Sequence, residues 1–245
     1  AFSHRPYHRL WRILANAALL LAPSEFHRTL HVWSGLSADH VSVNKNGINL
    51  PAPGYQHRAR DHRLRFAYLG GRAAHKGYFH LKQIFESLPE SNYSLVLVDI
   101  ERRLSVSGVT GDDWRIKGEL EIVPPFEQSD LDDFFAGIDV LLFPSAWKES
   151  FGLTVREAMS RDVWVIATDC GGPVEDIVDG VNGQLVAMGD LDGLRNAIRG
   201  LLQQPERLCN YQNPHKDDIR GFREQASELA GLLRQVVASE RNCAD

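Results

Sequence analysis

Short apolar runs alternate along the chain with longer segments in which apolar residues recur at helical spacing. The apolar runs predict strands at 18–24, 63–69, 94–98, 116–123, 140–143, 163–167 and 183–186. The segments of helical spacing predict helices at 76–88, 131–135, 151–160, 191–202 and 222–237, the second of them capped by Ser129. Strands and helices that alternate in this way indicate an α/β protein with a Rossmann-like, doubly wound parallel sheet flanked by helices.

Composition is that of a soluble globular protein and argues against nucleic acid as a partner. The 245 residues can hold one large or two small domains, with 43% hydrophobic and 24% charged residues. The net charge is −5, and no run of Lys and Arg offers a basic surface. The cysteines, Cys170, Cys209 and Cys243, are odd in number and lack metal-site spacing, which favours reduced thiols in a cytosolic protein.

The N-terminal segment allows two interpretations. Basic residues within 5–12, an apolar run at 13–22 and then Pro23-Ser24 imitate a secretory signal peptide. We favour the other interpretation, a helix that runs into the strand at 18–24, and the apolar run is too short to span a membrane. The expected location is the cytoplasm, with a peripheral position at the inner face of a membrane left open.

The segment 140–186 carries the clearest chemical pattern. Glu149 and Glu157 lie eight positions apart around Ser-Phe-Gly-Leu, after an apolar strand and before a Gly171-Gly172 turn. A strand that enters a helix through a glycine-bearing turn leaves free N–H groups and the positive end of the helix dipole at that turn. The pattern therefore predicts an anion site, with two carboxylates placed to hold hydroxyl groups on either side of it.

An ordered series of motifs in this segment resembles the donor-binding signature of the family 4 retaining glycosyltransferases, which have the two-domain GT-B fold. The matching residues are Pro144-Ser145, Glu149 with Phe151-Gly152, Glu157-Ala158-Met159, Gly171-Gly172 with Glu175, and the turn at 180–183. Two glutamates at this spacing alone would be weak evidence, because such pairs are common on solvated helices, whereas the whole series is specific.

Two further matches lie upstream. Leu69-Gly70-Gly71-Arg72 with Lys76-Gly77 is similar to the family's loop that grips the donor diphosphate, and 41–49 is similar to its interdomain hinge. The resemblance extends over 18–204. It implies three parts: a remnant of the N-terminal acceptor domain with the hinge at 1–50, a donor-binding domain at 51–213, and a helical segment at 214–245.

The resemblance also implies a reaction. The chain would be the donor-binding part of a retaining glycosyltransferase, which moves a sugar from a nucleotide-diphosphate sugar of the UDP or GDP type to a glycan, lipid or small-molecule acceptor. Neither a metal nor any cofactor besides this donor is expected. The expected partners are the missing N-terminal domain and, because the apolar run at 18–22 would seek a cover, a second copy of the chain.

The resemblance assigns roles to individual residues. Glu149 would hold hydroxyls of the transferred sugar as part of the catalytic set, and Glu157 would hold the ribose. The backbone amides of Phe151, Gly152 and Leu153 would cradle phosphate, because a helix start exposes such donors.

The remaining predicted residues surround the diphosphate. Arg72 and Lys76 would complete the catalytic set by neutralising the leaving diphosphate, the former as a planar fork and the latter as a point charge. Gly71 and Ser150 would complete the substrate-binding set. Trp147 would either line the sugar pocket or stand exposed.

The chain departs from the family at several positions, and these leave alternatives open. Asp99-Ile100-Glu101-Arg102 and Pro124-Pro125-Phe126 replace glycine-bearing turns near the nucleotide base, so the identity of the base stays open. Asp162 and Trp164 stand where Gly and Pro are usual, with an expected effect on packing. A second candidate function is a non-catalytic nucleotide-sugar-binding module that needs a partner chain. Other Rossmann-type enzymes are disfavoured, because no G-x-G-x-x-G follows a strand.

Overall fold

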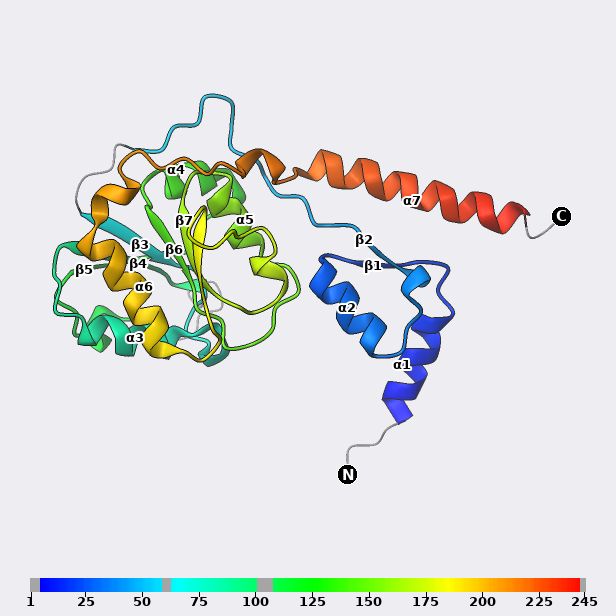
Figure 1. The fold of residues 1–245 in the computed structure, drawn as a ribbon, viewed down its shortest axis with the longest axis horizontal. Coiled ribbons are helices and arrows are strands. Elements are labelled where there is room, and N and C mark those ends of the chain that lie inside the picture. The colour runs from blue at the N-terminus through cyan, green and yellow to red at the C-terminus, as the bar shows by residue number, and fades with distance from the viewer. Residues whose placement is uncertain (1–4, 59–62, 101–107, 243–245) are drawn as a thin grey trace. The chain divides into compact units, whose positions relative to one another are not determined.

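The computed structural model describes residues 5–58, 63–100 and 108–242, which divide into two compact units (Figure 1). The larger unit is Ile48–Ile219. The smaller unit combines Ala1–Gly47 with Arg220–Asp245, so that the two ends of the chain belong to the same unit.

The larger unit is built on a parallel sheet of six strands with the order β5-β4-β3-β6-β7-β8. The strands are β3 (Leu64–Tyr68), β4 (Tyr93–Val98), β5 (Glu119–Val123), β6 (Val140–Phe143), β7 (Trp164–Thr168) and β8 (Gly183–Val186). The chain first runs outward from β3 to β5 and then returns to place β6 against the other side of β3. The strand order therefore reverses between β3 and β6, which is where open α/β sheets bind their ligands.

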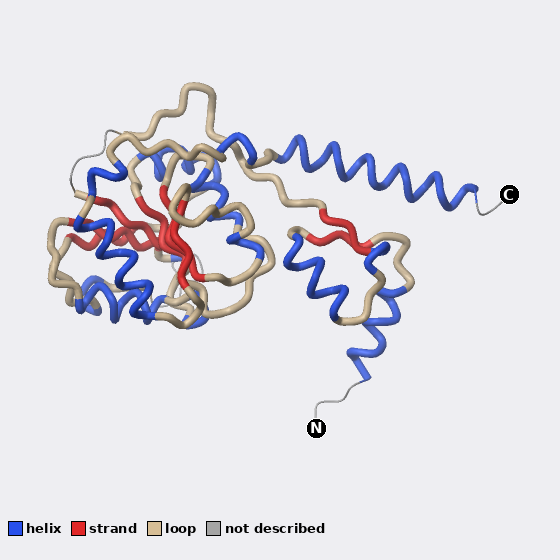
Figure 2. The backbone as a smooth tube through the Cα atoms, viewed as in Figure 1, coloured by secondary structure: helices blue, strands red, loops and turns tan. Residues whose placement is uncertain are grey.

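Helices cover both faces of this sheet, as the sequence predicted (Figure 2). They are α3 (Tyr78–Ser87), α4 (Leu131–Ala136), α5 (Leu153–Met159) and α6 (Leu191–Gln203). Successive side chains of a strand point to opposite faces. Phe66 and Tyr68 of β3 accordingly pack in one core with α3 and α6, and Ala67 packs in the other core with α4 and α5.

Most predicted elements are present, and the predicted strands at 140–143 and 183–186 match β6 and β8 in both bounds. The predicted cap at Ser129 was wrong. A capping box joins Glu127 and Asp130 instead, in which the Glu127 amide donates to the Asp130 carboxylate at 3.0 Å. This box opens a 3-10 turn (Gln128–Asp130), so Ser129 lies inside the turn that precedes α4.

Asp162 and Trp164, two of the departures from the family pattern, shape the packing at the start of β7. Asp162 has a φ of 58°, a left-handed conformation that glycine adopts more readily. Its carboxylate accepts a hydrogen bond from the Asn213 amide at 2.9 Å and forms an ion pair with Lys216 at 3.0 Å. Trp164 packs edge-on against Tyr211 with ring centres 5.2 Å apart. Both residues thereby fix the segment that follows α6.

The smaller unit contains a two-stranded parallel sheet. Its described elements are α1 (Arg5–Ala15), β1 (Leu20–Ala22), α2 (Glu25–Trp33), β2 (Val41–Val43) and α7 (Phe222–Asn242). The favoured interpretation of the N-terminal segment, a helix followed by a strand, agrees with α1 and β1. Gln225 ties α7 to this unit, because its side chain accepts from the Gly47 amide at 2.8 Å and donates to Asn46 at 3.2 Å. Among the described residues, no helix is both long and apolar enough to cross a membrane.

Candidate functional site

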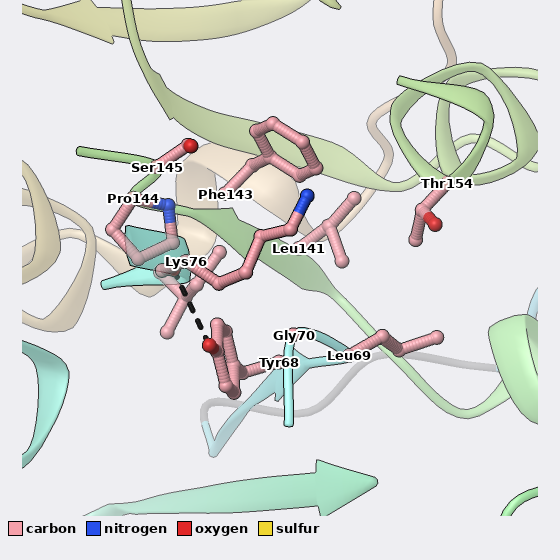
Figure 3. Close-up of a pocket in the computed structure, with 10 residues that line it drawn as sticks. Tyr68, Leu69, Gly70, Lys76, Leu141, Phe143, Pro144, Ser145 and Thr154 are labelled. Carbon is pink, nitrogen blue, oxygen red and sulfur yellow. Dashed lines mark hydrogen bonds between the residues drawn. The ribbon is translucent and has the colours of Figure 1, made fainter. Parts of the chain in front are cut away.

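The carboxyl ends of β3 and β6 lead into two loops that line one cavity at the switch point. The cavity has a volume of about 100 Å³. Its lining consists of Tyr68, Leu69, Gly70, Lys76, Leu141, Leu142, Phe143, Pro144, Ser145 and Thr154 (Figure 3). A larger cavity of about 270 Å³ lies at the amino ends of β3, β4 and β5, but none of the predicted site residues lines it. Of the predicted site residues, Lys76 lines the smaller cavity.

Lys76 of this cavity contacts Glu149, which lies 73 positions further along the sequence. The Lys76 ammonium donates to Glu149 Oε1 at 2.6 Å. The Lys76 side chain is 34% exposed and the Glu149 side chain 17%. Both charges are thus partly shielded from water, which strengthens their attraction relative to an exposed surface pair. A cation and a carboxylate that were both predicted to hold the donor are therefore adjacent.

Ser145 connects this pair to the loop that follows β6. Its hydroxyl lies 2.9 Å from Glu149 Oε1 and 2.9 Å from the Trp147 carbonyl, and it accepts a hydrogen bond from the Trp147 amide at 3.3 Å. The loop is thus held at its start, close to the carboxylate. The Trp147 side chain is 68% exposed and is not among the residues that line the cavity.

The turn before α5 requires glycine at position 152. Gly152 has a φ of 78°, and a Cβ at this position would lie 2.7 Å from Cβ of Pro173. A side chain would therefore be excluded both by the backbone conformation and by the neighbouring turn. Phe151 next to it is buried, with 3% of the residue exposed. Leu153 and Ser150 are exposed.

Glu157 lies apart from the cavity, on the buried side of α5. Only 7% of it is exposed, and burial raises the pKa of its carboxyl group. A hydrogen bond with Gln128 and the charge of Arg161 lower the pKa and oppose this effect. Glu157 therefore has Gln128 and Arg161 as neighbours, whereas Glu149 has Lys76 and Ser145, so the two glutamates lie in different environments.

Arg72 and Gly71 lie in the loop between β3 and Lys76. Gly71 is buried and has a φ of 61°. Arg72 is half-buried; burial raises the pKa of the nearby Tyr78, and the charge of Arg72 opposes this shift. Arg72 does not line the cavity. It stands at the edge of the site, next to the start of α3.

Sequence reasoning missed Tyr68, which supports the Lys76 loop. Its hydroxyl donates to the Lys76 carbonyl at 3.3 Å (Figure 3). A Cβ at position 70 would lie 2.2 Å from this hydroxyl, so the first glycine of the Gly-Gly pair leaves room for the Tyr68 side chain. The signal in the sequence was a tyrosine at the end of an apolar strand, directly before the loop.

Sequence reasoning also missed two buried arginines, Arg156 and Arg161, each 2% exposed. Arg156 pairs with Asp176 at 2.6 Å, and Arg161 pairs with Asp132 at 2.6 Å. Burial lowers the pKa of Arg156, while the Asp176 carboxylate raises it. Arg156 follows the buried Val155 on a helical segment that is otherwise rich in core residues. Its place among these core residues was the signal in the sequence that Arg156 is buried.

Cys170 is hydrogen-bonded to Glu149 through the backbone. It is a free, fully buried thiol, and burial together with the Glu149 charge raises its pKa to about 12. Its carbonyl accepts from the Glu149 amide at 2.7 Å. Cys209 is also free, whereas Cys243 lies outside the described residues.

Two predictions concern ligands other than the sugar. Within residues 5–58, 63–100 and 108–242, no group of three His, Cys, Asp or Glu side chains is placed to hold a metal ion. Of the departures near the expected base pocket, Glu101-Arg102 lies outside the described residues, while Asp99 is buried at the end of β4. The identity of the base therefore stays open.

Known proteins similar to this chain include curated sequences that match it over different lengths. The family model of glycosyl transferases group 1 matches residues 56–216, more than half of the chain. An uncharacterized 41.2 kDa protein in the cps region of Klebsiella pneumoniae is 26% identical over 240 residues, 92% of this chain and 62% of that protein. D-inositol 3-phosphate glycosyltransferase 2 of Catenulispora acidiphila is 33% identical over 112 residues, 46% of this chain and 24% of that enzyme.

Solved structures match the fold over nearly the whole chain. Anabaena HepE in complex with UDP-glucose matches with a TM-score of 0.76 at 18% identity, over 96% of this chain and 68% of that one. Sucrose-phosphate synthase from Thermosynechococcus elongatus matches with a TM-score of 0.75 at 21% identity, over 98% of this chain and 65% of that one. At such identities the likeness concerns the fold, which is the C-terminal half of GT-B. The chain therefore belongs to the glycosyl transferases group 1 family.

Proposed function

We propose that this chain is the donor-binding part of a retaining glycosyltransferase, which takes a sugar from a nucleoside diphosphate sugar. The observation that carries the proposal is the contact of Lys76 with Glu149 at the switch point. A nucleoside diphosphate sugar needs positive charge at its phosphates and an acceptor of hydroxyl hydrogen bonds at its sugar. The adjacent ammonium and carboxylate offer both within one site.

The chemistry of the leaving diphosphate indicates the role of the cations Lys76 and Arg72. When the bond from the sugar to the diphosphate breaks, negative charge grows on the phosphate oxygens. Lys76 and Arg72 stabilise this charge because they are already in place, which is the preorganised electrostatic effect that most lowers such barriers. Lys76 carries three N–H donors and gives one to Glu149, so two remain for phosphate oxygens.

The two carboxylates have separate roles in the proposal. Glu149 accepts hydrogen bonds from hydroxyls of the transferred sugar, at the side of the cavity where Ser145 fixes its carboxylate. Glu157 accepts from the ribose, and the amides of Phe151, Gly152 and Leu153 donate to the phosphates between them. Gly71 and Ser150 complete the pocket.

The neighbours support a nucleotide sugar as donor and a glycan or lipid as acceptor. HepE was solved with UDP-glucose, and two of the curated relatives are a lipopolysaccharide core mannosyltransferase of Rhizobium meliloti and a capsular polysaccharide glycosyltransferase of Staphylococcus aureus. Donors of the UDP or GDP type fit the site as proposed, and retention of the anomeric configuration follows from the family resemblance. Proton NMR of the transfer product tests retention directly.

The experiment is calorimetric titration with UDP, GDP and the corresponding nucleosides. Lys76→Ala and Arg72→Ala are each expected to weaken binding of the diphosphate by about tenfold or more, because a charge-assisted contact contributes on the order of 1.5–3 kcal/mol. Binding of the nucleoside should stay unchanged. Equal losses for diphosphate and nucleoside would remove these residues from the diphosphate site.

Lys82→Ala is the matched control. Lys82 also forms a close ion pair with a glutamate, Glu86, with both side chains 28% exposed. This pair lies within α3 and does not line the cavity. The control should therefore leave the affinities for diphosphate and nucleoside unchanged.

A further inference from the structure

Arg156 connects the two turns that surround the proposed donor. One of its terminal nitrogens donates to the Phe151 carbonyl and, at 3.5 Å, to the Gly152 carbonyl. The other donates to the Gly172 carbonyl at 3.0 Å. Its Nε pairs with Asp176 at 2.6 Å. A single buried guanidinium thus holds carbonyls from both turns at once.

The two turns lie against each other at this point. The Glu149 amide donates to the Cys170 carbonyl at 2.7 Å, and the Gly172 amide donates to the Glu149 carbonyl at 3.0 Å. A Cβ on Gly172 would lie 2.0 Å from the Ser150 carbonyl oxygen, so no side chain fits between the turns. The Arg156 guanidinium carbon lies 3.6 Å from the centre of the Phe151 ring.

The geometry of the peptide bond shows in which direction the Gly152 and Leu153 amides point. In a trans peptide the C=O and N–H bonds point in opposite directions, and the described residues contain no cis peptide. The Phe151 carbonyl shares its peptide with the Gly152 amide, and the Gly152 carbonyl shares its peptide with the Leu153 amide. Because Arg156 holds both carbonyls, both amides face away from it. Neither amide nitrogen donates a hydrogen bond to another described residue.

We propose that Arg156 is a positioning residue for the donor diphosphate. Its planar guanidinium fixes the carbonyls on the buried side of both turns and so aims the amides of Gly152 and Leu153, together with the Glu149 loop, at the ligand. This inference rests on the proposed function, because the Gly152 and Leu153 amides that Arg156 orients are the ones proposed to bind the phosphates. Arg156 does not touch the donor itself.

The decisive variant is Arg156→Lys. Lysine keeps the charge and its attraction to Asp176, but an ammonium cannot reproduce the planar fork that reaches carbonyls in two turns. We expect the affinity for the nucleoside diphosphate to fall about tenfold, which is the effect of losing one good charge-assisted contact. The ligand is UDP or GDP, whichever the wild type binds more tightly. The affinity for the matching nucleoside should stay within about twofold.

Arg161→Lys is the matched control. Arg161 is equally buried and also combines an aspartate partner with two backbone carbonyls, those of Glu157 at 3.1 Å and Asn49 at 3.0 Å. None of these lies in the two turns. This variant should lose comparable thermal stability, while the ratio of diphosphate to nucleoside affinity stays that of the wild type.

A second measurement needs no ligand. Hydrogen exchange followed by NMR reports on the amides of Glu149 and Gly172, which bond one turn to the other. Arg156→Lys should accelerate exchange at both amides by about tenfold, because the turns separate more often. Arg161→Lys should not change exchange at either amide.

The outcomes separate the two proposals. Wild-type diphosphate affinity in Arg156→Lys, equal losses of diphosphate and nucleoside, or unchanged exchange at Glu149 and Gly172 would each overturn the positioning role and leave the proposed function intact. A wild-type chain that binds neither UDP nor GDP would overturn the proposed function, and with it the positioning role, before any variant is compared.

Discussion

The two glutamates of the motif have the same chemistry but different surroundings. Glu149 is paired with Lys76 and receives the Ser145 hydroxyl, so its carboxylate is held in place at the cavity. Glu157 is buried in α5, and burial raises the pKa of its carboxyl group. Two residues that look equivalent in the sequence therefore differ in what they can bind.

The difference predicts distinct effects of the two amide substitutions. Glu149→Gln should weaken binding of UDP-glucose about tenfold and leave UDP affinity undiminished, because an amide offers one oxygen where the carboxylate offers two. Glu157→Gln should weaken UDP and UDP-glucose alike, since both carry the ribose. Calorimetric titration of both ligands with both variants checks the prediction. Loss of UDP affinity in Glu149→Gln would reverse the assigned roles.

The raised pKa of Glu157 also predicts how stability depends on pH. A carboxyl group whose pKa is higher in the folded state stabilises the fold below its ordinary pKa of 4.5 and loses this contribution as pH rises through the folded value. The stability of Glu157→Gln relative to wild type should therefore increase with pH above 4.5. Urea unfolding at a series of pH values measures it.

Glu86 is a control, because its pKa is shifted in the opposite direction to that of Glu157. The hydrogen bond from Lys82 lowers the pKa of Glu86, so this group stabilises the fold above its ordinary pKa and loses the contribution as pH falls. Glu86→Gln should therefore cost stability at neutral pH and little in acid. Parallel pH profiles for the two variants would contradict the assignment of their surroundings.

The loops at the switch point depend on how the elements β3, α3 and β6 approach one another. A short 3-10 turn (Ala74–Lys76) ends at Gly77, which has a φ of 84° and immediately precedes α3. A Cβ at Gly77 would lie 2.1 Å from the Pro144 carbonyl oxygen, directly after β6. Gly77 thus lies where the two loops approach too closely for a side chain at this position.

This contact predicts an unequal response of two glycines. Gly77→Ala should lower the free energy of unfolding by about 1–3 kcal/mol more than Gly180→Ala, because it adds overlap with backbone to the cost of a left-handed φ. Gly180 has a similar φ of 76°, but a Cβ at this position would meet no atom within 4 Å. Chemical denaturation of both variants measures the difference, and equal losses would show that the Pro144 contact is not tight.

The molecule as a whole consists of two units, and all predicted site residues, from Gly71 to Glu157, belong to the larger one. This unit has its own sheet with a core on each face, and each core is formed within Ile48–Ile219. The smaller unit has a separate cluster around Ala22, Leu36 and Val41. The candidate site and its supporting core thus lie within one unit.

We therefore expect the excised segment 48–219 to fold and to bind the donor nucleotide. It should unfold in one cooperative transition, and its affinity for UDP or GDP should lie within about twofold of that of the whole chain, as for independent parts of a structure. Urea unfolding followed by far-UV circular dichroism, together with calorimetry, tests this. A broad, non-cooperative transition would show that residues outside the segment are needed for its fold.

Most of the fold could be predicted from the chain because its signals are local. The mostly apolar run that forms β4 and the helical spacing of Leu194, Ile198 and Leu201 in α6 depend only on neighbours in sequence. The Ser129 cap failed because another local pattern, the Glu127 and Asp130 pair, competed for the same helix start. The candidate site was predicted through the order of its motifs, whereas the support by Tyr68 and Arg156 was not.

The sequence by itself determined the strands and helices of the large sheet, most of the apolar residues that face its core, and which motifs carry charge. These properties follow from spacing along one chain, with a period of two for strands and 3.6 for helices. Only the tertiary structure decided that β6 lies against β3, that Lys76 meets Glu149 across 73 positions, and that Arg156 holds two turns together. Such contacts depend on where distant segments pack, because a side chain finds its partner through the shared core and not through its neighbours in sequence.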